Sequence, residues 1–176
     1  MTPHDPTDVR PSPCRRRTHR SMRGLRVASG VLLLLFAGRA SLGQAGESPI
    51  PNPEFKLGEQ LPAGWTLEGP GRWVDRQVLE VTGSGEDSSF WHCGFYRFQP
   101  GHTYRFQTRV RRVSGSGTAI TGPNFANRDQ TGLTSQWQWI GHVFRVPDPC
   151  DGAFLRLGQW HATGAIQFDQ VRVSPV

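Results

Sequence analysis

Residues Tyr96 to Gly117 read YRFQPGHTYRFQTRVRRVSGSG and carry the signals that decide the fold of this chain. Residues 99–102, QPGH, have the composition of a type II turn, because proline presets φ at the second position and glycine allows a positive φ at the third. Residues 104–111 then alternate between apolar and polar side chains, and this period of two indicates a half-buried strand. The stretch therefore predicts two paired strands joined by the turn, followed by a second turn.

The outward row of this predicted strand is polar, while its inward row is the core candidate. Such a row is either solvated or forms the floor of a groove that hydrogen-bonds a polar ligand, and that choice is the functional question. Its members are Arg105, Gln107, Arg109 and Arg111.

From Pro49 onward the chain shows short alternating runs separated by Gly, Pro, Asn, Asp and Ser, and no apolar pattern of helical period. Ten short strands in about 130 residues indicate one domain built from two packed sheets. We predict them near residues 53–57, 64–68, 71–75, 77–82, 88–98, 103–113, 117–125, 136–146, 153–161 and 165–173.

The positive charge of the chain is concentrated at its N-terminus. The 176 residues have a formal charge of +6, and residues 1–45 hold eight arginines and two aspartates. Residues 46–176 hold twelve basic and twelve acidic residues. A nucleic-acid-binding surface needs its positive charge on the folded part, so we expect no nucleic-acid partner.

The same N-terminal segment has the features of a secretory signal. The apolar run at residues 31–37 is too short to span a bilayer as a helix, and Gly43-Gln44-Ala45 offers a small-x-small cleavage site. We expect translation from Met22, a leader and signal peptide in residues 1–45, and a mature domain of residues 46–176 without a membrane span. That domain would be secreted, periplasmic or at the cell envelope; the alternative is an uncleaved anchor.

Export leaves two cysteines, Cys93 and Cys150, in an oxidising compartment. An even pair there is consistent with one disulfide, which we predict. Neither cysteine has a Cys-x-x-Cys partner or a histidine at ligand spacing, so a zinc site is disfavoured.

Short motifs follow one another along the whole mature length, and in this order they resemble the carbohydrate-binding modules of family 4/9. These are cellulose-binding modules of secreted bacterial glycosidases with a galactose-binding-like fold. The resemblance implies an all-β, two-sheet β-sandwich (jelly roll) with a ligand groove on the concave sheet and often a structural calcium ion. The motifs are Asn52-Pro53-Glu54-Phe55, Pro62-Ala63-Gly64-Trp65, Leu79–Gly83, Pro100–Tyr104, Trp137 seven residues before Phe144, and Phe168–Val173.

One motif departs from the family at the position of a calcium ligand. There an acidic residue follows the phenylalanine of the opening motif, whereas here that position is Lys56, whose ammonium group repels a cation. Glu54 lies two residues earlier, an offset of about 7 Å along a strand. Asp169 remains as a metal-ligand candidate, but we expect no cofactor, with calcium absent or weakly bound and Lys56 free to pair with Asp169.

Tryptophans and the polar row together predict a sugar-binding face, because indole rings stack on sugars while Arg and Gln reach the hydroxyl groups. Core parity in each strand belongs to other apolar residues, such as Leu155 and Leu157 beside Trp160. The alternative is that loops cover this face and the tryptophans pack beneath them. We assign Trp65 to structural packing, and the family resemblance implies the same role for Trp137. The predicted carbohydrate-binding residues are Trp91, Arg105, Gln107, Arg109, Trp139, Arg156 and Trp160.

No pattern in the chain indicates catalysis. The Gly-x-Ser-x-Gly elbow, His-x-x-x-His and phosphate loops are absent, and the carboxylates that a glycosidase needs in a facing pair fall mostly in predicted turns. The sequence favours a secreted, non-catalytic module that recognises a polysaccharide or glycan through a Trp/Arg-lined groove. The alternatives are a structural or adhesive sandwich that binds a protein at the cell envelope and a small glycan-active hydrolase.

Overall fold

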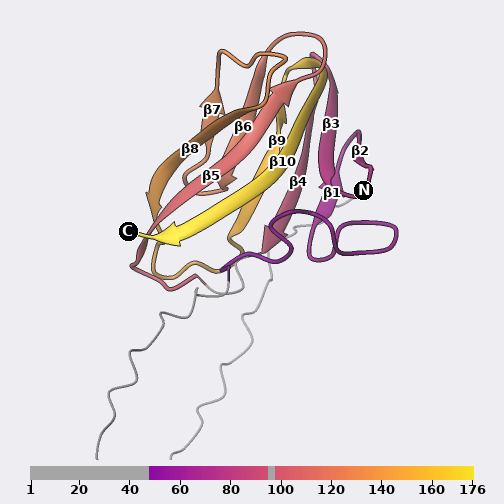
Figure 1. Ribbon diagram of the computed structural model, residues 1–176. Coiled ribbons are helices and arrows are strands. Elements are labelled where there is room, and N and C mark those ends of the chain that lie inside the picture. The colour runs from indigo at the N-terminus through magenta and orange to yellow at the C-terminus, as the bar shows by residue number, and fades with distance from the viewer. Residues whose placement is uncertain (1–47, 95–97) are drawn as a thin grey trace, which may run out of the picture. The chain divides into compact units, whose positions relative to one another are not determined.

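The computed structural model describes residues 48–94 and 98–176, which form ten antiparallel strands in two sheets (Figure 1). Sheet I has the strand order β1-β4-β9-β6-β7 and sheet II the order β2-β3-β10-β5-β8. The all-β two-sheet sandwich is therefore confirmed. The strands are β1 Thr66–Glu68, β2 Gly71–Val74, β3 Val78–Ser84, β4 Ser88–Gly94, β5 Thr103–Arg112, β6 Thr118–Pro123, β7 Arg128–Gln130, β8 Gln138–Arg145, β9 Phe154–Trp160 and β10 Thr163–Pro175.

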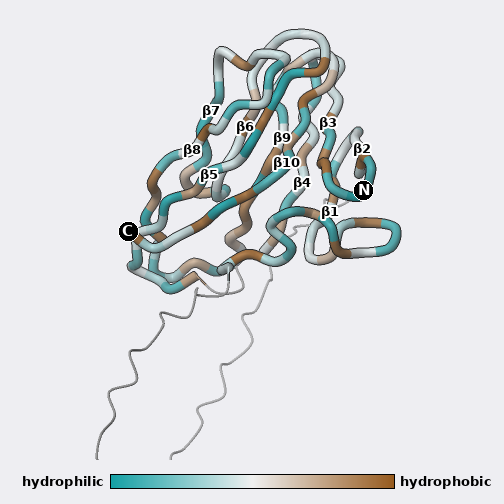
Figure 2. The backbone as a smooth tube through the Cα atoms, viewed as in Figure 1, coloured by the Kyte–Doolittle hydropathy of each residue, from teal (hydrophilic) through white to brown (hydrophobic). Residues whose placement is uncertain are grey.

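Strand β5 follows the alternation that its sequence predicts. Tyr104, Phe106, Thr108 and Val110 are buried, and the residues between them face outward. The hydropathy of β5 and β10 changes back and forth along each strand (Figure 2). Successive side chains of a strand point to opposite faces, so this pattern gives sheet II one apolar face and one polar face.

The core lies between the two sheets. Phe106, Val110 and Phe168 of sheet II are fully buried, as are Leu155 and Leu157 of sheet I. Burying a side chain of this size stabilises a fold by about 1.5 to 3 kcal/mol relative to leaving it exposed. The apolar rows of both sheets therefore hold the sandwich closed and leave the outer faces for polar side chains.

Trp65 confirms its assignment to structural packing. Its side chain is 3% exposed, its ring meets Phe55 edge to face at 5.2 Å between centroids, and its Nε1 donates to the Pro51 carbonyl oxygen at 3.1 Å.

The predicted type II turn is present, but the strands beside it do not pair with each other. The His102 amide donates to the Gln99 carbonyl oxygen at 3.1 Å, and Gly101 has a φ of 78°. Strand β4 belongs to sheet I, whereas β5 pairs with β8 and β10 in sheet II. The prediction of a paired hairpin is wrong, because alternation fixes which residues face the core but not which strand is the neighbour.

The other differences in strand placement lie at loops. The predicted strand at 53–57 is a closed loop in which Asn52 and Phe55 have positive φ and the Asn52 side chain bonds the Leu57 backbone. The other nine predicted strands are present. The short β7, Arg128–Gln130, was not predicted because Arg-Asp-Gln offers no apolar residue to alternate.

The predicted leader and signal peptide, residues 1–45, lie outside the described residues. Within residues 48–94 and 98–176, no helix has the length and hydrophobicity needed to cross a bilayer.

Cys93 and Cys150 are both free thiols, so the predicted disulfide is not present in this structure. Alternation along β4 turns Cys93 into the sandwich, where its side chain is 2% exposed and burial raises the pKa of its thiol to about 12. Cys150 is half-buried in the loop before β9.

Candidate functional site

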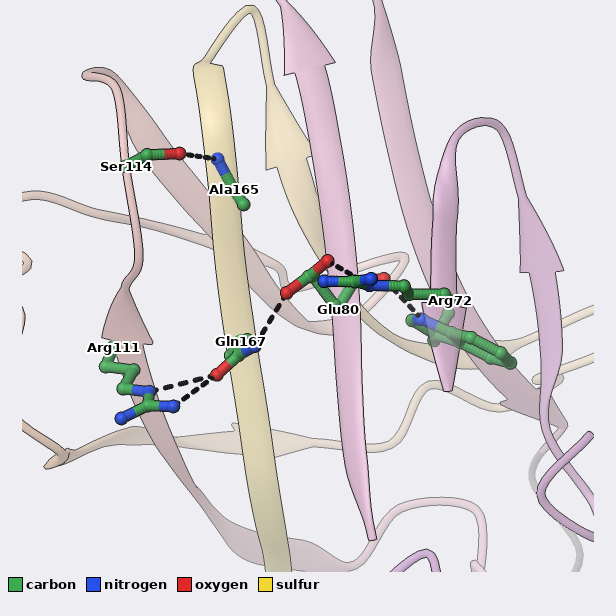
Figure 3. Close-up of polar contacts among 7 residues, drawn as sticks. Arg72, Glu80, Arg111, Ser114, Ala165 and Gln167 are labelled. Carbon is green, nitrogen blue, oxygen red and sulfur yellow. Dashed lines mark hydrogen bonds and ion pairs between the residues drawn. The ribbon is translucent and has the colours of Figure 1, made fainter. Parts of the chain in front are cut away.

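Four polar side chains form one continuous row across the outer face of sheet II (Figure 3). The row follows direct cross-strand pairs on β2, β3, β10 and β5, in the order Arg72, Glu80, Gln167 and Arg111. Arg72 Nε lies 2.6 Å from Glu80 Oε1, and Gln167 Nε2 donates to Glu80 Oε2 at 2.6 Å. Gln167 Oε1 in turn accepts from Nε and Nη2 of Arg111 at 2.9 and 2.7 Å. The row therefore holds the Arg111 guanidinium in a fixed orientation.

The indole ring of Trp137 lies under two guanidinium groups of β5. The central carbons of Arg111 and Arg109 are 4.6 and 5.3 Å from the ring centroid, which is within the range of a cation–π contact. Arg109 also pairs with Asp169, with 3.3 Å between Nη2 and Oδ2. Trp137 is thus half-buried on the outer face and contributes to its surface.

A shallow cavity of about 260 Å³ lies between β5 and β8 on this face, where Gly141 is paired directly with Gln107. A side chain at position 141 would collide with the backbone of β5, so the cavity depends on the glycine at this position. Trp139 and Val143, two residues before and after Gly141, are 41% and 47% exposed. Arg105 lies on β5 opposite Val143. The cavity therefore offers an indole, an amide and a guanidinium around a small floor.

Strand β10 places a second guanidinium beside this cavity. Arg172 is paired directly with Gln107, and its central carbon lies 4.2 Å from the centroid of the Trp139 ring. Arg172 and Arg105 are both exposed, and neither forms an ion pair with a carboxylate of the described residues.

The structure brings four of the seven predicted sugar-binding residues together on the outer face of sheet II. Arg156 and Trp160 have the predicted outward parity, but β9 belongs to sheet I, so they lie on the opposite face of the sandwich. The prediction that all seven share one face is wrong. The four that do are Arg105, Gln107, Arg109 and Trp139.

Trp91 is a core residue, and its predicted surface position is wrong. Its side chain is 0% exposed, and its Nε1 donates to the Glu80 carbonyl oxygen at 3.1 Å. The prediction took Phe90, Tyr96 and Phe98 as the core row of one strand at residues 88–98, which placed Trp91 on the opposite face. However, β4 ends at Gly94, so the burial of Phe98 gives no information about the orientation of β4.

The outer face of sheet I carries its own aromatic and arginine set. The central carbon of Arg156 lies 5.3 Å from the ring centroids of both Phe90 and Phe154, and burial lowers the pKa of its guanidinium. His92 Nε2 lies 3.1 Å from Glu68 Oε1 at the side of this set. Sheet I is therefore a second possible location for a ligand.

Two surface residues were missed for identifiable reasons. A bulge between Phe168 and Val171 changes the parity of β10, so simple alternation from Phe168 places Arg172 in the core. Trp137 was assigned to packing from its place in the family resemblance alone. Trp137 lies two positions before Trp139, and in a strand this spacing predicts that both side chains are on the same face.

The residues at the family's calcium position do not fit a calcium ion. Lys56 Nζ lies 2.7 Å from Glu54 Oε2, so Lys56 pairs with Glu54 and not with Asp169 as the sequence suggested. Asp169 pairs with Arg109, and the cavity of about 340 Å³ between these groups also holds the Arg111 guanidinium. Across 48–94 and 98–176, no group of three or more His, Cys, Asp or Glu residues is placed to hold a metal. The Lys56 and Arg111 side chains line this cavity, and their positive charges oppose a bound cation.

Comparison with solved structures finds this fold in proteins of low sequence identity. A CBM4 carbohydrate-binding module is 19% identical, with a TM-score of 0.53 over 72% of this chain and 99% of that chain. The CBM22-2 xylan-binding domain of Xyn10C from Paenibacillus barcinonensis is 14% identical, with a TM-score of 0.50 over 66% and 94%. The enzymatically active domain of tailspike protein 4 from bacteriophage CBA120 is 10% identical, with a TM-score of 0.50 over 73% and only 21%. No family model and no curated protein matches the chain.

At these identities the similarity shows the fold. It confirms that the resemblance to family 4/9 carbohydrate-binding modules extends to the three-dimensional arrangement, since the chain spans nearly all of the CBM4 module.

Proposed function

We propose that this chain is a secreted, non-catalytic module that binds a polysaccharide or glycan on the outer face of sheet II. The observation that carries the proposal is the cavity over Gly141, which brings Arg105, Gln107 and Trp139 together. The shared fold with carbohydrate-binding modules supports the same class of ligand.

The cavity has the chemical groups that a sugar ring needs. An exposed indole such as that of Trp139 offers an apolar surface with a polar edge, and binding sites combine such surfaces with a few placed polar groups. The Gln107 amide both donates and accepts hydrogen bonds, and the Arg105 guanidinium donates only. A sugar beside the Trp139 ring therefore meets donors and an acceptor at its hydroxyl groups.

The carboxylates of this face support a binding role over a catalytic one. Glycosidases need two carboxyl groups that flank the scissile bond, one as acid and one as base or nucleophile. Glu80 is 4% exposed and paired with Arg72, and Asp169 is paired with Arg109. Both carboxylates are thus engaged in structural contacts.

The apolar run and small-x-small site of residues 31–45 support export of the module. On this proposal residues 46–176 act outside the cytoplasm, where polysaccharides are available. N-terminal sequencing of the exported protein tests this part, and a mature N-terminus near residue 46 is expected.

A binding assay with two matched tryptophan variants tests the proposed site. The purified protein is applied to a glycan array together with Trp139→Ala and Trp160→Ala. Trp139→Ala removes the exposed indole of sheet II and should abolish or strongly reduce glycan signals, whereas Trp160→Ala removes an equally exposed indole on sheet I and should retain them. Loss of binding in Trp160→Ala alone would move the site to the face of Arg156 and Phe154. No glycan signal for the unmodified protein would favour the protein-binding alternative.

A further inference from the structure

The strand positions that point outward from sheet II carry more positive than negative charge. These positions hold six arginines but only two carboxylates, Glu80 and Asp169, although residues 46–176 as a whole hold equal numbers of basic and acidic residues. Loop residues at the margin of the face add Glu54, Lys56 and Asp75, which leaves the six arginines in excess over the carboxylates. The six are Arg72, Arg105, Arg109, Arg111, Arg145 and Arg172.

The two carboxylates neutralise arginines that lie away from the Gly141 cavity or at its margin. Glu80 is paired with Arg72, and Asp169 with Arg109. The partner of Arg111 is the neutral amide oxygen of Gln167. Within the described residues, the two arginines nearest the cavity, Arg105 and Arg172, form no ion pair with a carboxylate.

Arg105 and Arg172 carry positive charge at the cavity and beside it. Arg105 lines the cavity, and Arg172 lies beside Gln107 with its guanidinium over the Trp139 ring. A guanidinium stacked on an indole keeps the hydrogen-bond donors of its edge free, and the planar fork of donors matches carboxylate and other oxyanions. A sugar stacked near Trp139 would place its substituents within reach of these two groups.

We infer that the ligand is an anionic glycan, whose sugar rings carry carboxylate or sulfate groups that Arg105 and Arg172 recognise. This inference rests on the proposed glycan-binding function of the same face. It assigns specificity to two arginines, one of which, Arg172, was not among the residues predicted from the sequence.

Pairs of polymers that differ only in charge test the inference. The affinity of the purified protein is measured for polygalacturonate and its methyl ester, and for dextran sulfate and dextran. We expect binding to at least one charged polymer to be at least tenfold tighter than to its neutral counterpart. Preference for polygalacturonate identifies a carboxylate and preference for dextran sulfate a sulfate. This preference should shrink between about 0.05 M and about 1 M salt, where the screening length falls to about 3 Å.

Single-charge variants connect the preference to the site. Arg172→Gln and Arg105→Gln should each reduce affinity for the charged polymer roughly tenfold, as expected for loss of a charge-assisted hydrogen bond. The matched control is Arg128→Gln, which removes one exposed arginine from β7 of sheet I and should leave affinity unchanged. Equal losses in all three variants would show that net charge alone is responsible and would overturn the inference.

Three further results have distinct meanings. Equal or tighter binding to neutral polymers would overturn the anionic specificity and leave the glycan-binding function standing. Equal binding to polyglutamate, an anion without sugar, would overturn the inference by showing that charge alone suffices. Binding to no glycan, charged or neutral, would overturn the proposed function itself.

Discussion

Glu80 and Gln167 face each other across β3 and β10, and the Gln167 amide nitrogen donates to Glu80 Oε2 at 2.6 Å. A carboxylate only accepts hydrogen bonds, so Glu80 decides which end of the Gln167 amide points toward it. The amide oxygen must then face Arg111, which it binds through two donors. A nearly buried carboxylate on β3 thus orients an arginine on β5, two strands away.

Glu80→Gln tests this relationship through stability. The substitution keeps the shape of the side chain but places an amide N–H opposite either Arg72 or Gln167, where only an acceptor satisfies the donor. We expect unfolding free energy to fall by about 1 to 3 kcal/mol, the cost of an unsatisfied buried polar group. Urea denaturation measures it. In the control variant Arg72→Gln, the loss should be smaller, because the new amide N–H can still donate to Glu80 Oε1. Equal losses would contradict the assigned role of Glu80.

Trp91→Ala should destabilise the fold by about 3 to 5 kcal/mol, because it removes a fully buried indole and leaves a cavity between the sheets. Trp160→Ala removes an indole that is 52% exposed and should change stability by about 0.5 kcal/mol or less. Thermal or chemical denaturation compares the two. Equal losses of unfolding free energy in the two variants would contradict the placement of Trp91 in the core and Trp160 at the surface.

Alkylation followed by mass spectrometry tests whether the thiols of Cys93 and Cys150 are free. Cys93 and Cys150 are free, and burial raises the pKa of the Cys93 thiol to about 12, which leaves little reactive thiolate at neutral pH. Native mature protein (residues 46–176, without Cys14) treated with iodoacetamide should be modified slowly at Cys93, and the same protein unfolded without reduction should take up two labels. Uptake of none after unfolding would restore the disulfide expected from the sequence.

His142 makes stability depend on pH below neutrality. Burial lowers the pKa of its imidazole, while a hydrogen bond of its Nε2 to the Ala126 carbonyl oxygen acts in the opposite direction. A lowered folded-state pKa means that the unfolded chain binds the proton first, so this contribution is complete above about pH 6.5 and is lost as the pH falls below it. Denaturation midpoints at pH 7.5 and 5.5 measure the loss.

The matched variant for this experiment is His142→Gln, which keeps an N–H donor for the Ala126 carbonyl oxygen but does not titrate. Its stability should change less between the two pH values than that of the unmodified protein. The same change in both proteins would assign the pH dependence to other groups.

The sequence was sufficient for the fold class, an all-β two-sheet sandwich, because alternation indicates which residues of each strand face the core. The burial of Phe106 and Val110 and the turn at Gly101 follow directly from local pattern and turn chemistry. Sheet membership did not follow, since the neighbours of β5 lie far away in the chain. This is why residues with correct outward parity, Arg109 and Arg156, were placed on one face although they belong to different sheets.

The candidate site was predictable only where strands are regular. Arg105, Gln107 and Trp139 lie on uninterrupted strands, and their predicted outward orientation is confirmed. Arg172 follows a bulge, and a single extra residue reverses the parity of everything after it. Trp91 was misplaced because the prediction extended one strand over residues 88–98, whereas β4 comprises Ser88–Gly94.

The indole N–H signals of Trp65, Trp91, Trp137, Trp139 and Trp160, five of the six tryptophans, test the location of the glycan site most directly, because each of the five reports a place in the sandwich described above. Two-dimensional ¹H–¹⁵N NMR spectra are recorded while a bound glycan is titrated into the labelled protein, with assignments from single Trp→Phe variants. A glycan bound to the outer face of sheet II should shift the Trp139 signal most and the Trp137 signal to a smaller extent. The signals of Trp65, Trp91 and Trp160 should not shift. Shifts confined to Trp160, with Trp139 unchanged, would contradict a glycan site on the outer face of sheet II.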